Sequence, residues 1–263
     1  MSRLTPAALL ILVQTMPATA GSPEPPAWAS APATESVQSS EADFLFGRPT
    51  MTLGIRALWS RPRADGDIFA FVTEELTLSK SDFNAPGVAV DVGFPLTSRL
   101  DILAGVEFDQ TKAASEVRRF VEDNGLPIQQ ETALRQVNLS GSLDFALSPR
   151  GRSIGQYAWV PARVTPYVGV GGGLLWYQFE QIGDFVDSLD PGLPITSGRL
   201  ASDGWTVSSH VLAGVDIKLA RRLSLTTDVR YRWANATLSQ DFIGFDPIDL
   251  TGLRVGVGVQ FVF

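Results

Sequence analysis

The chain has 263 residues, of which 44% are hydrophobic and 19% are charged, and its formal net charge is −7. This negative balance argues against a nucleic-acid partner, because binding a phosphate backbone normally requires a basic face. The lack of cysteine excludes disulfides, thiolate metal sites, thiol catalysis and a lipid-modified N-terminal cysteine.

Residues 1–20 have the pattern of a secretory signal peptide. Arg3 supplies the positive charge, residues 7–13 form an apolar stretch, and residues 18–20 read Ala-Thr-Ala, which matches an A-x-A cleavage site. We therefore expect export with cleavage near Ala20. Residues 21–43 are rich in Pro, Ala, Ser and Glu and have little to bury, so we predict a disordered periplasmic lead-in before a folded domain at 44–263.

Alternation of apolar and polar residues recurs eight times in that domain. In residues 50–59, for example, Met51, Leu53 and Ile55 share one face, and Thr52 lies on the other. Such alternation predicts a strand with one apolar face. The remaining segments are residues 87–96, 100–109, 136–147, 164–177, 205–219, 223–233 and 253–263. No later segment has about 18 consecutive apolar residues, so a helical membrane span is excluded.

A soluble sandwich or lipocalin-like barrel would also show this alternation, so two further features are needed to decide between a soluble fold and a membrane barrel. The apolar face carries hardly any charge, and the connections are short at 95–98 and 220–222 but long elsewhere, as in outer-membrane barrels. With the N-terminus in the periplasm, the large aromatic residues fall into the two girdles expected at the membrane interfaces. The outer girdle comprises Trp59, Phe108, Trp176, Trp205, Tyr231 and Trp233, and the periplasmic girdle comprises Phe94, Phe145, Phe261 and Phe263. The fold class predicted is all-β, an eight-stranded antiparallel up-and-down transmembrane β-barrel.

Two motifs resemble a known superfamily. They are the glycine-rich strand at 166–174, which reads PYVGVGGGL, and the closing strand at 255–263, which reads VGVGVQFVF. From Pro49 to Phe263 the chain is similar to the small outer-membrane barrels that include the OmpA transmembrane domain, OmpX, OmpW and opacity-type proteins. The resemblance implies that Phe263 is a recognition signal for the barrel-assembly machinery. It implies little about activity, because members include structural barrels, adhesins, small-solute conduits and a few lipid-modifying enzymes.

The predicted faces place many charges in the barrel interior. A lumen of eight strands is about wide enough for side chains to fill, so we interpret these charges as a paired structural network. They are Arg56, Asp91, Asp101, Glu107, Asp109, Asp144, Asp216, Asp228, Arg230, Arg232 and Arg254. The inward glycines leave open a narrow conduit for small or apolar solutes.

Three other candidate sites are less well supported. His210 follows Ser208 and Ser209, which suggests a comparison with lipid A deacylases, but the strand parity points Ser208 and His210 to the lumen, away from lipid. Acidic loops at 184–190 and 241–249 lack EF-hand spacing, so no metal site is predicted. Residues 169–173 are glycine-rich, but no helix follows, so a nucleotide loop is rejected.

The sequence therefore predicts a non-enzymatic outer-membrane barrel with a structural or surface-interaction role, without catalytic residues or cofactor. Its expected partners are outer-membrane lipid, lipopolysaccharide and the assembly machinery, and we expect a monomer. A conduit and a lipid-modifying enzyme remain alternatives. Long loops are predicted near residues 60–86, 112–128, 181–204 and 237–250. In the first, residues 68–72 alternate, and we predict that they form strand above the membrane. The pairing of residues 148–163 stays open.

Overall fold

The computed structural model describes residues 44–122, 125–186 and 195–263. The predicted signal peptide (1–20) and lead-in (21–43) lie outside the described residues. None of the helices in these ranges is long and apolar enough to cross a membrane.

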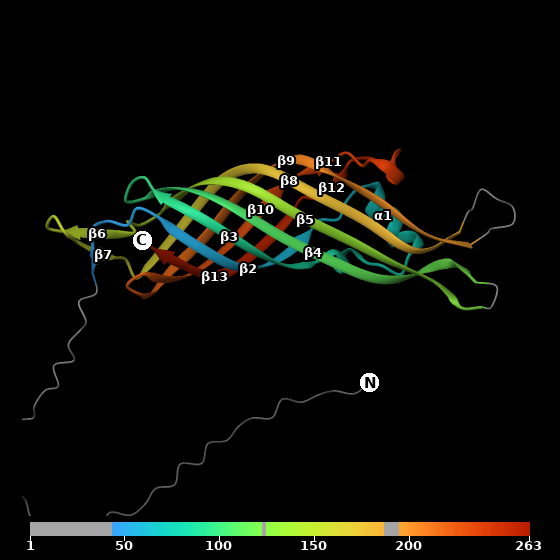
Figure 1. The fold of residues 1–263 in the computed structure, drawn as a ribbon, viewed down its shortest axis with the longest axis horizontal. Helices are drawn as coiled ribbons and strands as arrows, with labels where there is room; N and C mark the ends of the chain where they lie inside the picture. Colours follow the sequence, from blue (N-terminus) through green and yellow to red (C-terminus); the bar gives the residue numbers. More distant parts are fainter. Residues whose placement is uncertain (1–43, 123–124, 187–194) are drawn as a thin grey trace, which may run out of the picture. The chain divides into compact units, whose positions relative to one another are not determined.

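The described residues contain a closed ring of eight antiparallel strands, in the order β10-β13-β2-β3-β4-β5-β8-β9 (Figure 1). The last strand of the chain closes the ring, with Val255 of β13 opposite Trp59 of β2. The predicted eight-stranded up-and-down barrel is confirmed. The ring strands are β2 (Thr52–Pro62), β3 (Ala85–Pro95), β4 (Leu100–Val121), β5 (Pro127–Ala146), β8 (Val164–Val186), β9 (Ile195–Ala220), β10 (Leu223–Trp233) and β13 (Gly252–Val262).

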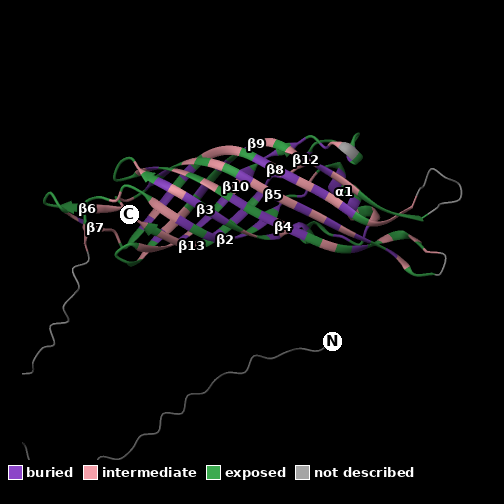
Figure 2. Ribbon diagram, in the orientation of Figure 1, coloured by how far each residue is buried: buried purple, intermediate pink, exposed green. Residues whose placement is uncertain are grey.

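Burial alternates along the ring strands with a period of two, as Figure 2 shows in alternating colours. In β4, for example, Ile102 and Val106 are exposed, whereas Asp101 and Glu107 are buried. The side chains that face out of the ring are thus mainly apolar, and the buried ones include all eleven charged residues predicted for the lumen. This distribution is the inverse of a soluble barrel and is that of a barrel in lipid.

The ring strands fall into two length classes. β2, β3, β10 and β13 have 11 residues each, whereas β4, β5, β8 and β9 have 22, 20, 23 and 26. At a rise of about 3.3 Å per residue, ten extra residues extend a strand by about 33 Å. The predicted loops at 112–128 and 181–204 are therefore largely wrong, because most of their described residues continue the β4–β5 and β8–β9 hairpins.

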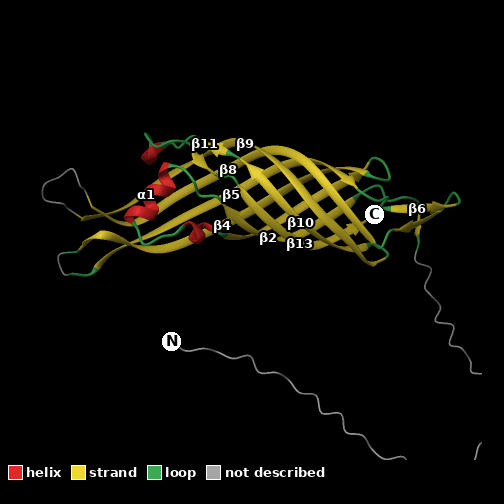
Figure 3. Cartoon of the chain, turned by 180° about the vertical axis from the view of Figure 1, so that it is seen from behind, coloured by secondary structure: helices red, strands yellow, loops and turns green. Residues whose placement is uncertain are grey.

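The prediction that residues 68–72 form strand is also wrong. Residues Asp67–Glu75 form helix α1, followed by the 3-10 helix η1 (Lys80–Phe83), and both lie at the end of the barrel away from the C-terminus (Figure 3). Ile68, Phe69 and Val72 are buried together, because positions three and four apart share a helix face. A short apolar run is compatible both with the period of about 2 residues of a strand and with the period of about 3.6 residues of a helix, and here burial inside the barrel mouth favours the helix.

Small elements complete both ends. At the loop end, β11 (Asn235–Ala236) pairs with β12 (Ile248–Asp249), with the 3-10 helix η2 (Gln240–Phe242) between them. At the end that carries the C-terminus, β1 (Leu45–Phe46), β7 (Ala158–Pro161) and β6 (Gly151–Ile154) form a separate sheet (Figure 1). This sheet accounts for the long connection between β5 and β8, whose pairing the sequence left open.

Candidate functional site: the barrel interior and its two ends

All eleven charged residues predicted for the lumen are buried in the structure. Nine of them form ion pairs, which connect different walls of the barrel, whereas Asp144 and Arg232 form none with the described residues. Arg230 of β10 pairs with Glu107 of β4, which lies four strands away around the eight-stranded ring and hence on the opposite wall. Because such a pair crosses the full width of the lumen, it occupies the space through which a solute would pass.

Further contacts fill the same layers of the lumen. Arg56 lies 2.7 Å from Asp91 and 2.7 Å from Asp228, so one guanidinium joins β2, β3 and β10. Arg254 of β13 reaches across to Asp109 of β4 at 3.3 Å. Buried charges are costly unless they are paired, so this arrangement fixes the side chains in the interior.

Arg232 and Gln136 complete this layer. Arg232 is fully buried and donates to the Gln136 side-chain oxygen, which also accepts from Arg254 at 3.2 Å.

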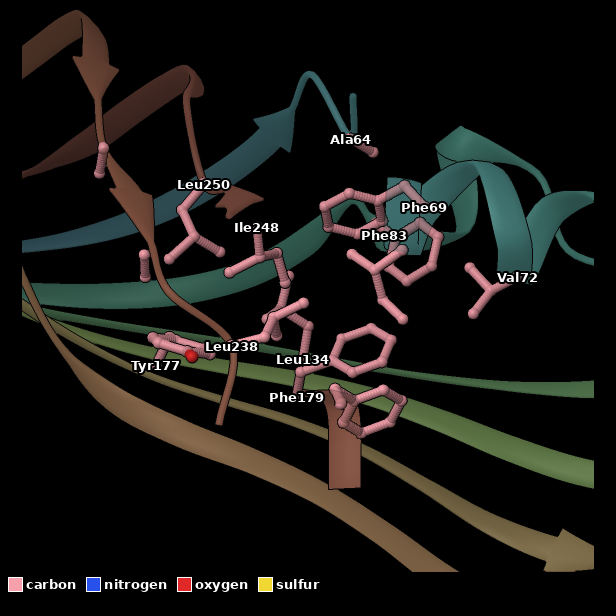
Figure 4. Packing of buried hydrophobic residues seen from close by; sticks show 14 of the residues in the cluster. Ala64, Phe69, Val72, Phe83, Leu134, Tyr177, Phe179, Leu238, Ile248 and Leu250 are labelled. Atoms are coloured by element: carbon pink, nitrogen blue, oxygen red, sulfur yellow. The ribbon is translucent and has the colours of Figure 1, made fainter. Parts of the chain in front are cut away.

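The loop end of the lumen is closed by an apolar cluster, which we call the plug (Figure 4). The Phe69 ring of α1 packs edge-on against Phe83 at 4.9 Å between centroids and against Phe179 of β8 at 6.2 Å. From the other side, Phe242 of η2 packs on Phe179 at 5.3 Å. The wall contributes inward residues of the long strands, such as Leu134. The plug therefore joins the first and last long loops to the inner face of the barrel.

The end with the C-terminus is also closed. Arg150, in the connection between β5 and β6, pairs with Asp101 of β4 and lies 2.5 Å from Asp216 of β9. Its guanidinium lies 5.6 Å from the centre of the Tyr167 ring, and its backbone nitrogen donates to the Ser98 carbonyl at 3.0 Å. One side chain thus binds two walls of the barrel at this mouth.

The predicted aromatic residues lie on the outward face. Trp176 of β8 and Trp205 of β9 are direct cross-strand partners, and the Tyr231 and Trp233 rings pack at 4.9 Å. At the other end, Phe94, Phe145, Phe261 and Phe263 are exposed. Their contact with the membrane interfaces remains a prediction, as does the role of Phe263 in assembly.

Within the described residues, the remaining candidates do not assemble into a catalytic or metal site; residues 187–190 of the acidic loop at 184–190 lie outside the described residues. The Ser208 hydroxyl donates to the Asn138 side-chain oxygen at 2.8 Å rather than to His210, and all three residues are buried in the lumen. A serine nucleophile needs a base within hydrogen-bond reach, and this geometry does not supply one. Among the described residues, no group of three or more His, Asp or Glu side chains is placed to hold a metal ion.

Sequence reasoning missed the plug and Arg150. A signal for the plug was present in the sequence: Leu134, Tyr177 and Phe179 alternate in step with the inward-facing residues of their strands, but their side chains are large and hydrophobic, whereas inward residues nearer the middle of the barrel are polar. Arg150 lies outside any alternating segment, so periodicity gave no information about it.

No protein-family model and no curated protein matches the chain. Among solved structures, Neisserial surface protein A has 11% sequence identity over 81% of this chain and 97% of that one, with a TM-score of 0.47. The outer-membrane protein OprG from Pseudomonas aeruginosa has 11% identity over 83% and 98%, with a TM-score of 0.45. A major outer-membrane protein from Thermus thermophilus has 13% identity over 81% and 99%, with a TM-score of 0.41.

The chain resembles small outer-membrane β-barrels. Its own architecture is that of an integral outer-membrane barrel, because a closed ring with an apolar exterior and a charged interior satisfies its backbone within the lipid. In such barrels the short turns face the periplasm and the long loops face outward. We accordingly call the end with the C-terminus the periplasmic end and the end with the plug the extracellular end.

Proposed function

We propose that this outer-membrane barrel is a non-enzymatic surface protein that does not conduct solutes and acts through its extracellular extension. The observation that carries the proposal is the occlusion of the lumen at three levels. These are the plug at the extracellular end, the Arg230–Glu107 pair across the middle and Arg150 at the periplasmic end. This occlusion supports the surface role over the conduit.

The extracellular extension supplies a surface for a partner. β4, β5, β8 and β9 are consecutive in the ring, so their extra length forms a four-stranded sheet above the shorter strands. The ladder between β9 and β8 runs out to Ile195, whereas the ladder between β9 and β10 ends at Ser209.

Part of the β9 edge beyond Ser209 is covered. Asn235 and Asp241 contact Thr206 and Ala201 of this edge. Within the described residues, no strand pairs with the outer edge of residues 195–200. An open strand edge is a template for pairing with an extended segment of another protein.

Planar-bilayer recording tests the closed lumen. The chain beginning at Gly21, refolded and inserted, is expected to give no unitary current steps at any holding voltage. A reproducible open level would overturn this part of the proposal in favour of the conduit.

The surface role is tested on whole cells of a heterologous Gram-negative host. We expect adhesion to protein-coated surfaces to rise when the chain is produced, and to fall to the background of the empty host when the β8–β9 hairpin is cut back to the Gly183–Gly198 pair. The matched control cuts the β4–β5 hairpin back to the Glu116–Gln129 pair, which leaves the β9 edge intact. Equal adhesion of all variants and the empty host would contradict the surface role.

A further inference from the structure

The extracellular end carries an exposed apolar patch. Helix α1 and the loop between β11 and β12 both lie at this end (Figure 1). The Phe71 ring of α1 packs edge-on against the Phe245 ring of the loop, with 5.7 Å between their centroids. Ile243, two residues before Phe245, is 78% exposed, and Phe71 is 46% exposed. We call Phe71, Ile243 and Phe245 the apolar patch.

The plug holds the patch in place. Val72, next to Phe71 in the helix, is fully buried, and Phe242, next to Ile243 in the loop, is buried in the plug as well. Because the neighbouring residues are fixed, the backbone that carries the patch loses little conformational entropy when a partner binds. Large apolar side chains that are held at the surface in this way are typical of the anchor points of protein interfaces.

Three carboxylates border the patch. Asp67 lies four residues before Phe71 in α1 and Glu74 lies three residues after it, so both are on the same face of the helix as the ring. Asp246 directly follows Phe245 in the loop. All three carboxylates are exposed, and none of them forms an ion pair with another described residue.

The basic residues near α1 are already paired. Arg63 and Lys80, on either side of the helix in the sequence, both contact Asp65. Arg119 of β4 lies 3.4 Å from Glu75, at the end of the helix. The helix itself contains no Lys or Arg. These cations therefore leave Asp67 and Glu74 uncompensated.

The loop that carries Ile243 has no basic residue of its own. The nearest ones in the sequence are Arg232 before it and Arg254 after it, and both are buried in the lumen. The patch thus combines an apolar centre with a negative rim. This arrangement is that of an interface whose partner is positively charged.

We infer that the apolar patch and its three carboxylates form a docking site for a cationic segment of another protein, in which an apolar side chain lies among Lys or Arg residues. The apolar side chain packs on the patch, and the cationic groups pair with the rim and lie over the exposed ring of Phe71. A membrane surface is a poorer occupant, because the phosphates of lipopolysaccharide repel the rim. The inference rests on the proposed surface role, and the site is separate from the open β9 edge.

Fluorescence anisotropy of a labelled peptide of alternating Lys and Leu tests the site, with the chain from Gly21 in phosphatidylcholine nanodiscs and empty nanodiscs as background. We expect saturable binding, and a loss of affinity of at least about tenfold in the Phe71→Ala/Ile243→Ala variant. The matched control is Val121→Ala/Ile182→Ala, which truncates two exposed apolar residues of β4 and β8. It should keep the affinity of the parent within about twofold. A gel shift on heating verifies that every variant is folded.

A second pair of variants tests the rim. Binding should weaken by at least about tenfold when the three rim carboxylates are neutralised, and it should then lose most of its dependence on salt. The control removes the same charge from the long strands and should bind like the parent. The rim variant is Asp67→Asn/Glu74→Gln/Asp246→Asn, and its control is Glu116→Gln/Glu131→Gln/Asp184→Asn.

Several results would overturn the inference. They are the absence of saturable peptide binding, equal binding of a peptide with Glu in place of Lys, and equal losses in the patch variants and their controls. Loss of vesicle binding or of self-association in the Phe71→Ala/Ile243→Ala variant, with peptide binding unchanged, would assign the patch to lipid or to a second copy of the chain and would also overturn it.

The same peptide assay separates this site from the proposed surface role. The variant whose β8–β9 hairpin is cut back to the Gly183–Gly198 pair keeps the patch and should bind the peptide like the parent. A chain that promotes adhesion but does not bind the peptide would overturn the docking site alone. A chain that binds the peptide but does not promote adhesion would contradict the surface role and support the site.

Discussion

The plug is predicted to open locally when Phe69 is truncated, while the barrel stays folded. Phe69 is fully buried, and its ring packs against Phe83 and Phe179. Replacing a buried phenylalanine by alanine costs about 3–5 kcal/mol. Because the plug is held mainly by such apolar contacts, this cost falls on the docking of α1 rather than on the strand ladders of the ring.

Hydrogen exchange measures this effect directly. The amide of Leu76 donates to the Val72 carbonyl and that of Ala70 to the Gly66 carbonyl, so both report on the opening of α1. A loss of at least about 3 kcal/mol corresponds to exchange that is roughly 100-fold faster at these amides. Amides of β2 and β13 should be unchanged.

Phe71→Ala is the matched control, because Phe71 lies in the same helix with 46% of its surface exposed. Within the described residues, its one contact with another aromatic ring is with Phe245. Its exchange rates should change by less than tenfold. Equal acceleration in both variants, or loss of the heat-dependent gel shift in Phe69→Ala alone, would refute the assignment of Phe69 to a plug that opens independently of the barrel.

Three further predictions concern the lumen, an extracellular loop and the wall. Glu107→Gln should lower the unfolding free energy by about 3–5 kcal/mol, because it removes the nearer of the two carboxylates that pair with the buried Arg230 and leaves only Asp228 at 3.7 Å. Urea unfolding in lipid vesicles measures this loss. Glu131→Gln removes an exposed carboxylate that lies 3.0 Å from Lys112 and should cost below about 1 kcal/mol. Lys80 and Arg63 hold the pKa of Asp65 below its ordinary value of 3.8. The stability that this carboxylate gives to the folded loop is therefore present above pH 3.8 and is lost as the pH falls through the lower folded pKa. Amide hydrogen exchange in residues 63–83 should rise in acid, and an Asp65→Asn variant that keeps the same acid response would contradict this. Gly214→Ala should reduce the refolding yield, because an added Cβ would lie 2.5 Å from both the Tyr167 ring and the Thr227 carbonyl oxygen. Gly141→Ala, whose added Cβ would have its nearest neighbour at 3.7 Å, should refold like the parent. Equal refolding of the two variants would show that the barrel wall can shift to accommodate a side chain at position 214.

The sequence by itself determined the barrel. A period of two places Ile102 and Val106 on one face and Asp101 and Glu107 on the other, and a ring that must satisfy its backbone in lipid has few alternatives to closure. The same parity predicted which charged residues are buried, because a strand offers a side chain only two directions.

Only the tertiary structure decided how the lumen is closed. Whether residues 68–72 become strand or helix depends on the apolar inner wall that Leu134 and Phe179 provide, and this wall exists only after β5 and β8 have paired. Likewise, nothing near Arg150 in the sequence indicates that it joins Asp101 and Asp216, which lie 49 and 66 positions away and meet it only when the ring brings β4 and β9 to the same mouth. Local periodicity fixes the face of each residue, whereas contacts between distant segments depend on the closed ring.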